Sequence, residues 1–229
     1  MTDVEVPGLF VVFEGGDGVG KTTQVDLLCR WLEGQGRKVV RTFEPGDTPV
    51  GAQIRRLVLD PATGELDPRA EALLYAADKA HHLAAVVRPA LARGAVVVCD
   101  RYVDSMLAYQ GAGRVLDAAE VEHIARWATA DLRPDLTVVL DMHTDDAVHA
   151  KTGKDRLESA GDSFHERARA FFLELADRDP AHYLVLDARR DRSVILGAVV
   201  DRVVARLGVD PPRRFGVDVL SDPAGTIGA

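Results

Sequence analysis

The chain has 229 residues, of which 47% are hydrophobic and 28% charged, a length and composition typical of a globular protein with one domain or at most two small ones. Its 28 Lys and Arg against 36 Asp and Glu give a formal net charge of −8 at pH 7, which disfavours general nucleic-acid binding. No stretch approaches the roughly 18 apolar residues needed to span a membrane, and the polar N-terminus is unlike a signal peptide, so we expect a cytoplasmic protein without a membrane partner.

Short apolar runs alternate with longer segments of helical periodicity, and this alternation predicts βαβ units around a parallel sheet covered by helices on both faces. The predicted strands are residues 9–13, 38–42, 95–99, 136–140 and 183–186. The predicted helices are residues 22–32, 49–59, 68–92, 117–129, 163–176 and 194–207. We therefore predict a single α/β domain over residues 1–208 with about five strands. A flexible tail over residues 209–229, rich in Pro, Gly and Asp, is expected to follow it.

The cysteines, the histidines and the absence of asparagine from the sequence limit the possible functions. Cys29 falls within a predicted helix and Cys99 at the end of a predicted strand, which favours two reduced core thiols over a disulfide. His81 and His82 have no acid or metal-ligand pattern around them and are predicted to be surface or interface residues. Asparagine is absent, so the Asn-Lys-x-Asp signature of GTP switches cannot occur.

A glycine-rich loop joins the first predicted strand to the first predicted helix. Residues 15–22 read GGDGVGKT, which matches the pattern GxxxxGK[ST] in the strand–turn–helix context that it requires. In this pattern main-chain N–H groups surround phosphates, Lys21 reaches the β- and γ-phosphates of a nucleoside triphosphate, and Thr22 holds Mg²⁺ through its hydroxyl. The predicted triphosphate site consists of Gly15, Gly16, Asp17, Gly18, Val19, Gly20, Lys21, Thr22 and Thr23.

Asp17 is the one acid in this loop. A carboxylate about 6 Å from a phosphate, at an effective dielectric constant near 20, costs on the order of 3 kcal/mol. We therefore expect Asp17 to point away from the donor phosphates, toward a hydroxyl or a metal-bound water on the acceptor side. The alternative is a solvated residue on the rim of the loop.

A second charged cluster follows the third predicted strand. Asp100 is predicted to hold Mg²⁺, directly or through water, and Arg101 offers a planar fork to a second phosphate. The alternative is that Asp100 caps the next helix and Arg101 pairs with a neighbouring acid. Four further candidates follow at helical spacing: Ser105, Met106, Tyr109 and Gln110.

Two more clusters complete the pattern. Residues 44–49 form a predicted turn with its own cap, which opens a helix carrying Arg55. Lys151, Lys154 and Arg156 crowd around a glycine in a predicted mobile segment over about residues 143–160. A basic lid of this kind suits a transferred phosphate, and the alternative is a solvated basic turn.

In their order and spacing, these motifs resemble the thymidylate kinases, which phosphorylate dTMP, from about residue 8 to residue 207. The segment DRYVDSMLAYQG is similar to the family's DR[YFH]xxSxxAYQG, and FEGGDGVGKTT and EPGDTPVGAQIR are similar to its phosphate loop and its EPGGTPxGxxIR segment. EALLYAADKAHH resembles the family's LLFxADRxxH helix, and Gly18 with a basic lid is similar to the bacterial subtype. The resemblance implies a P-loop NTPase fold, ATP and dTMP as substrates, Mg²⁺ as cofactor and a homodimer through the long helices.

The resemblance also implies roles around the acceptor. Arg101 would grip the 5′-phosphate of dTMP, and Asp17 would receive the 3′-hydroxyl. Tyr75 would stack on thymine, Gln110 would bond the base edge, and Tyr109 would crowd C2′ so that deoxyribose is preferred. The full predicted substrate site is Asp17, Glu44, Arg55, Tyr75, Lys79, Arg101, Ser105, Met106, Tyr109 and Gln110.

Four positions depart from the family pattern. Lys79 stands where the family has Arg, and Met106 where Ser, Thr or Asn is usual, so polar discrimination of thymine should weaken while contact with its methyl group could improve. Phe43 replaces an arginine and Asp47 the second glycine of EPGG, so the acceptor site loses one positive charge and gains a negative one.

These observations predict magnesium-dependent transfer of the γ-phosphate of ATP to dTMP, with Lys21 and Arg101 as the central cations. Lys151 aligns with the family's lid arginine, so Lys151, Lys154 or Arg156 would meet the charge of the transition state. One alternative is a kinase of another pyrimidine deoxynucleotide, such as dUMP or a 5-modified analogue. Two others are a thymidine-type nucleoside kinase and a nucleotide-binding module without catalysis.

Overall fold

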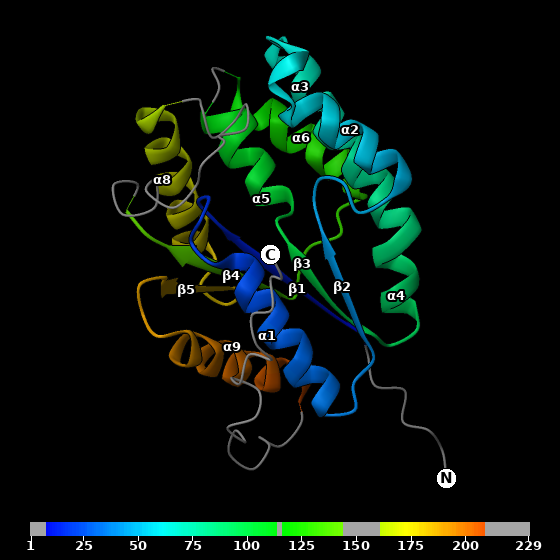
Figure 1. The fold of residues 1–229 in the computed structure, drawn as a ribbon, viewed down its shortest axis with the longest axis vertical. Helices are drawn as coiled ribbons and strands as arrows, with labels where there is room; N and C mark the ends of the chain where they lie inside the picture. The colour runs from blue at the N-terminus through cyan, green and yellow to red at the C-terminus, as the bar shows by residue number, and fades with distance from the viewer. Residues whose placement is uncertain (1–7, 114–115, 144–160, 209–229) are drawn as a thin grey trace, which may run out of the picture.

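The computed structural model describes residues 8–113, 116–143 and 161–208. Its sheet has five strands in the order β2-β3-β1-β4-β5, and all four pairings are parallel. The strands are β1 (Leu9–Gly15), β2 (Val39–Phe43), β3 (Val96–Asp100), β4 (Leu136–Asp141) and β5 (Tyr183–Asp187). The predicted α/β fold with a five-stranded parallel sheet is confirmed (Figure 1).

Helices cover both faces of this sheet, which explains why every residue of β1 is buried. Figure 1 shows α1 and α9 together on one side, with α2, α3, α5, α6 and α8 on the other. Within the described ranges, no helix has the length and apolarity needed to cross a membrane. The helices are α1 (Lys21–Gly34), α2 (Pro49–Leu59), α3 (Pro68–His82), α4 (Arg88–Ala92), α5 (Val103–Met106), α6 (Ala118–Thr129), α8 (Asp162–Arg178) and α9 (Arg192–Leu207).

Alternate side chains of β1 enter different hydrophobic clusters. Val11 belongs to the cluster that contains Leu28 of α1 and Val199 of α9. Phe10 belongs to a second cluster with Val87, on the opposite face. Both cysteines are buried free thiols, as predicted.

The helix predicted over residues 68–92 is not continuous. It consists of α3, a π-helical turn over Leu83–Val87, and α4. Pro89 explains the interruption, because a proline has no N–H to donate and its ring collides with the carbonyl four residues earlier in a regular helix. Two strands also begin one residue later than predicted, at Val39 and Val96.

The register of the sheet brings three segments to one edge. Phe13 of β1 and Phe43 of β2 both pair with Asp100, the last residue of β3, and β1 continues to Gly15 beyond this level. The phosphate loop, the turn at Glu44 and the segment at Arg101 therefore leave the sheet side by side. Ligands collect at such carboxyl ends in parallel α/β sheets.

Candidate functional site

The glycine-rich loop joins β1 to α1, as the sequence predicts. Gly15 has a φ of +128°, and a Cβ at this position would lie 2.3 Å from the main-chain oxygen of Leu140 in β4. Only glycine fits both constraints. Gly20 precedes α1 with a φ of +92°. The first turn of α1 therefore faces the loop, where its free N–H groups favour an anion.

The ammonium of Lys21 is buried inside this loop. Its Nζ donates hydrogen bonds to the main-chain oxygens of Gly15 at 3.1 Å and Gly16 at 2.5 Å. Burial, together with repulsion from Arg101, lowers the pKa of Lys21 to about 8. A cation held at a helix N-terminus and surrounded by main-chain groups can bind phosphate oxygens.

The two predicted metal ligands meet beside the loop. Thr22 Oγ1, in the first turn of α1, donates to Asp100 Oδ2 at the end of β3 over 2.6 Å. The alternative role of Asp100 as a helix cap is not seen, because α5 has no side-chain cap. Hydroxyl and carboxylate oxygens suit Mg²⁺, which takes one or two protein ligands and completes its shell with phosphates and waters. In the described ranges, no group of three or more His, Cys, Asp and Glu could hold a metal by itself.

Arg101 leaves β3 in an unusual backbone conformation. Its φ is +69°, in the left-handed region that a non-glycine residue adopts only at a cost of about 1–3 kcal/mol. The main-chain N–H of Arg101 donates to the oxygen of Phe13 over 2.9 Å, which holds the turn against β1. Strain of this kind is concentrated at functional sites.

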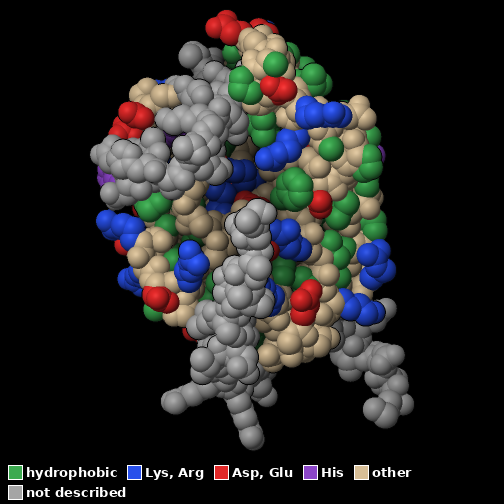
Figure 2. Space-filling view, in the orientation of Figure 1, with side chains coloured by type: hydrophobic (Ala, Val, Ile, Leu, Met, Phe, Trp, Pro, Cys, Tyr) green, Lys and Arg blue, Asp and Glu red, His purple; other side chains and the backbone are tan. Residues whose placement is uncertain are grey.

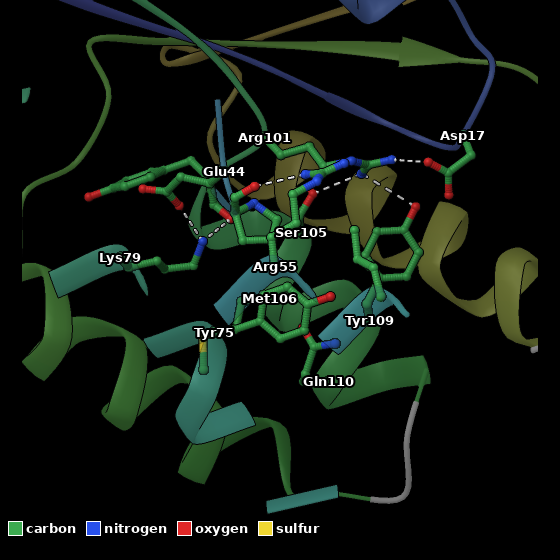
Figure 3. Close-up of a pocket in the computed structure, with 13 residues that line it drawn as sticks. Asp17, Glu44, Arg55, Tyr75, Lys79, Arg101, Ser105, Met106, Tyr109 and Gln110 are labelled. Atoms are coloured by element: carbon green, nitrogen blue, oxygen red, sulfur yellow. Dashed lines mark hydrogen bonds and ion pairs between the residues drawn. The ribbon is translucent and has the colours of Figure 1, made fainter. Parts of the chain in front are cut away.

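The guanidinium of Arg101 lies between the phosphate loop and α5 (Figure 3). Its Nη1 contacts Gly15 O at 3.1 Å and Ser105 Oγ at 3.0 Å, and its Nη2 contacts Asp17 Oδ1 at 2.6 Å. The carbon Cζ lies 5.2 Å from the centre of the Tyr109 ring. The neighbouring acid of the alternative interpretation of Arg101 is thus present, and it is Asp17 of the phosphate loop.

Charge pairing keeps Asp17 ionised. Burial alone would raise its pKa, but Arg101 and Lys21 outweigh burial and lower the pKa to about 2. Burial raises the pKa of Tyr109 to about 12, although the adjacent Arg101 opposes this shift. The mouth of the site therefore holds two cations and one anion beside a neutral phenol.

Glu14, the last but one residue of β1, was not among the predicted site residues. Its Oε1 accepts hydrogen bonds from the N–H groups of Tyr102 at 2.8 Å and Ser105 at 3.1 Å, and its Oε2 accepts from Ser105 Oγ at 2.5 Å. Ser105 Oγ also accepts from Arg101, so Glu14 holds in place the serine that orients the guanidinium. The available signal was an acid within an otherwise apolar strand.

A pocket opens from this mouth toward α2 and α3. All the predicted substrate-binding residues line this pocket. These residues come from four separate segments of the chain, so the sequence motifs alone could not establish that they lie together. Figure 3 shows Tyr75, Met106 and Gln110 gathered at the end of the pocket away from Asp17. The lining residues are Asp17, Glu44, Pro45, Arg55, Leu59, Tyr75, Lys79, Arg101, Tyr102, Ser105, Met106, Tyr109 and Gln110.

Lys79 is engaged in a buried polar network. Its Nζ donates to Glu44 Oε2 at 2.5 Å and to the main-chain oxygen of Tyr102 at 2.8 Å. His82 lies within hydrogen-bond distance of Glu44 Oε1, at 2.7 Å, and of Thr42 Oγ1, at 2.5 Å. Although burial alone would raise the pKa of Glu44, these two neighbours lower it. The ammonium of Lys79 is thus directed at Glu44 and the main chain.

This network corrects one prediction and locates one departure from the family pattern. His82 is 1% exposed, so its predicted place at the surface or an interface is wrong. It lies seven residues after Tyr75, which is two helical turns and therefore the same buried face of α3. His81 is exposed, as predicted. Asp47 accepts a hydrogen bond from Thr42 Oγ1, in β2, at 2.5 Å. Asp47 does not line the pocket, so its negative charge lies outside the acceptor site.

The predicted turn and helix after β2 are present. Thr48 caps α2, because its Oγ1 accepts from the N–H of Gly51 over 2.8 Å. Arg55, further along α2, donates to the oxygen of Pro45 at 2.7 Å and lies over the Phe43 ring at 5.7 Å. Phe43 therefore supports Arg55 through a ring contact.

Helix α8 contributes aromatic support that the motifs did not indicate. The Tyr109 ring stacks on Phe164 at 5.7 Å and meets Phe172 edge to face at 6.2 Å. Both phenylalanines lie on the apolar face of the helix predicted over residues 163–176, which was the available signal. The predicted lid cations Lys151, Lys154 and Arg156 lie outside the described residues, as does the predicted tail.

Known proteins are similar to this chain in sequence and in fold. The family model described as thymidylate kinase matches residues 13–196. The chain is 56% identical to a thymidylate kinase of Cutibacterium acnes over 200 residues, which covers 87% of this chain and 98% of that protein. It is 55% identical to a thymidylate kinase of Leifsonia xyli over 205 residues, covering 88% and 97%. The crystal structure of a thymidylate kinase from Ehrlichia chaffeensis superimposes with a TM-score of 0.69 at 28% identity, covering 86% of this chain and 99% of that one.

Proposed function

Because the chain belongs to the thymidylate kinase family, we propose that it uses a Mg²⁺-dependent in-line displacement to transfer the γ-phosphate of ATP to the phosphate of dTMP. The overall reaction is that of an ATP-dependent dTMP kinase and gives dTDP. One observation supports this mechanism above the others: Arg101 Nη1 lies 3.1 Å from the main-chain oxygen of Gly15 in the phosphate loop. An anion bound by Arg101 would therefore sit next to an anion held in the loop.

The donor side is assigned to the loop and to the start of α1. Lys21 and the loop N–H groups bind the β- and γ-phosphates. Thr22 and Asp100 would hold Mg²⁺, which supplies charge neutralisation at the phosphate oxygens when it is bound. The 2.6 Å contact between these two side chains supports a shared ligand role.

The acceptor side is assigned to Arg101, which orients the 5′-phosphate of dTMP through its planar fork. Asp17 receives the 3′-hydroxyl, as its place beside Arg101 and its lowered pKa of about 2 suggest. No general base is needed, because a phosphate monoester is already largely ionised near neutral pH. We assign to the lid cations Lys151, Lys154 and Arg156 the neutralisation of the negative charge that develops on the transferred group.

The base pocket is assigned to residues from α3, from α5 and from the π-helical segment Leu107–Gly113 that follows α5. Tyr75 stacks on the thymine ring, Met106 contacts the 5-methyl group, and Tyr109 excludes a 2′-hydroxyl. Phe164 and Phe172 hold the Tyr109 ring in place, which supports the last assignment.

We also propose a single domain over residues 1–208 that works as a cytoplasmic homodimer. An apolar groove runs between α3 and α6, where Leu73 is 57% exposed, and Trp127 on α6 is 81% exposed. Exposed apolar side chains on adjacent helices are typical of a protein interface. Sedimentation velocity should give the mass of a dimer, and a monomer at micromolar concentration would contradict this assembly.

A panel of acceptors tests the substrate. Steady-state rates with ATP and Mg²⁺ are compared for dTMP, dUMP, dCMP and thymidine. We expect the highest kcat/KM for dTMP, because Arg101 needs an acceptor phosphate and Met106 offers apolar contact to the methyl group. Higher activity with thymidine would contradict the role of Arg101, and equal activity with dUMP would contradict that of Met106.

The pH dependence of kcat/KM for ATP should report Lys21. Because kcat/KM reflects the free enzyme, it should be level below the Lys21 pKa of about 8 and fall about tenfold per pH unit above it. The kcat at saturating ATP should fall only at higher pH, since bound phosphates stabilise the ammonium. The control is Lys21→Arg, whose residual kcat/KM should not fall above pH 8, because a guanidinium stays charged. A wild-type profile that is level to about pH 10, near the ordinary lysine pKa, would contradict the assignment.

A further inference from the structure

Glu71, in the first turn of α3, has no role in the mechanism above. It is fully buried, with 0% of its surface exposed, although glutamate is rarely buried without a partner. Its Oε1 accepts a hydrogen bond from Gln110 Nε2 over 3.2 Å. Gln110 is 1% exposed and lines the pocket that holds Tyr75 and Met106.

The chemistry of this pair determines which way the Gln110 amide faces. A carboxylate only accepts hydrogen bonds, whereas an amide has one donating end and one accepting end. With its NH₂ group turned to Glu71, Gln110 must present Oε1 elsewhere. No described residue donates a hydrogen bond to Gln110 Oε1, so this acceptor is available at the base end of the pocket.

Two side chains of this pocket, Lys79 and Met106, do not compete with this acceptor. Lys79 directs its ammonium to Glu44 and to the Tyr102 main chain. Met106 contributes only a thioether, which is a weak acceptor and not a donor. Beside Met106, the direction of the Gln110 amide therefore decides whether the base meets an acceptor or a donor from this side chain.

We propose that Glu71 is a positioning residue that locks the Gln110 amide with Oε1 toward the nucleotide base, and so selects pyrimidines that carry a ring N–H. Thymine and uracil have a hydrogen on N3, whereas N3 of cytosine is an acceptor that would face Oε1 directly. A buried acceptor left without a donor weakens binding by about ten- to hundredfold. This inference rests on the proposed function and adds to it a rule for the class of base.

The test compares dTMP with 5-methyl-dCMP, which keeps the methyl group and reverses the polarity at N3. In Glu71→Gln, the partner at position 71 can donate as well as accept, so the Gln110 amide can face either way. We expect the ratio of the two kcat/KM values to fall at least about tenfold, mainly through KM. A purely structural role for Glu71 would weaken both substrates alike, and an unchanged ratio would overturn the proposal.

A second variant carries the test even if Glu71→Gln folds poorly. The double variant Glu71→Gln/Gln110→Glu keeps one amide and one carboxylate in the same volume, with an acceptor oxygen still facing the base. Its preference for dTMP should return to within a few-fold of wild type, and a ratio as low as that of the single variant would overturn the proposal. The matched control is Glu33→Gln on the exposed face of α1, which should leave the ratio unchanged.

The wild-type arm separates this inference from the proposed function. If the wild-type protein does not phosphorylate dTMP, the proposed function fails. If it does so while neither variant behaves as described, only the role of Glu71 fails. Thermal melting of each variant shows whether it is folded under the assay conditions.

Discussion

Replacing Lys21 with methionine should lower kcat by about 10³-fold or more while the protein stays folded. The methionine keeps an unbranched apolar stem of similar length but removes the only lysine ammonium placed within the phosphate loop of the described chain. Losing one preorganised neutral donor costs about 10²–10³-fold in other enzymes, and a charge that meets the transferred phosphate should cost more.

Although Lys21→Met should lower kcat, it should not lower the stability of the folded protein. The pKa of Lys21 is about 8 in the folded protein, against an ordinary value of 10.5, so below pH 8 the folded state carries a charge that it disfavours. That difference corresponds to a cost on the order of 3 kcal/mol. Lys21→Met should therefore raise the melting temperature, or at least leave it unchanged, at pH 7.

The control for this experiment is Lys38→Met, which removes an exposed lysine just before β2, at the opposite end of the sheet. It should leave kcat within about twofold of wild type, as expected for a surface substitution. Single-turnover assays with stopped-flow or quenched-flow mixing would separate the transfer step from product release. A Lys21→Met variant with a transfer rate within tenfold of wild type would contradict the donor-site assignment.

Replacing Arg101 with lysine should lower kcat/KM for dTMP by about 10²–10³-fold, although the positive charge is kept. The guanidinium contacts Gly15, Asp17 and Ser105 at the same time, between 2.6 and 3.1 Å. An ammonium is a point charge that cannot reach all three groups and also present two parallel donors to a phosphate.

The loss should appear with the nucleotide acceptor and not with ATP binding. Isothermal titration calorimetry with ATP, in the absence of dTMP, should give Arg101→Lys nearly the wild-type affinity for ATP. The matched control is Arg126→Lys, because Arg126 forms an exposed ion pair with Asp131 at 2.7 Å and such surface pairs contribute little. If Arg101→Lys keeps kcat/KM for dTMP within threefold of wild type, Arg101 does not clamp the acceptor phosphate.

Local sequence patterns predicted the elements of the fold well, because each strand and helix is encoded by the periodicity of neighbouring residues. The phosphate loop was recognised for the same reason, since its glycines, Lys21 and Thr22 are contiguous. The π-helical turn over Leu83–Val87 was missed, although Pro89 marks it, because helical periodicity alone does not register a missing N–H group.

The candidate residues of the acceptor site were also identified from the sequence, but their partners were not. Lys79 was treated as a group facing the base, and it binds Glu44, which lies 35 residues away in the chain. His82 is predicted from the sequence to be a surface or interface residue, and it is buried against the same Glu44. Glu14 belongs to no sequence motif, and it holds Ser105, which lies 91 residues away in the chain.

The sequence by itself determined the parallel α/β architecture, the phosphate loop and the family, because all three depend on the order and spacing of residues along the chain. Tertiary structure alone decided which charged and polar groups face one another: Arg101 with Asp17, Lys79 with Glu44, and Gln110 with Glu71. The physical reason is that a hydrogen bond depends on distances of a few ångströms and on direction. Both are set only when strands and helices that are remote in sequence pack against each other.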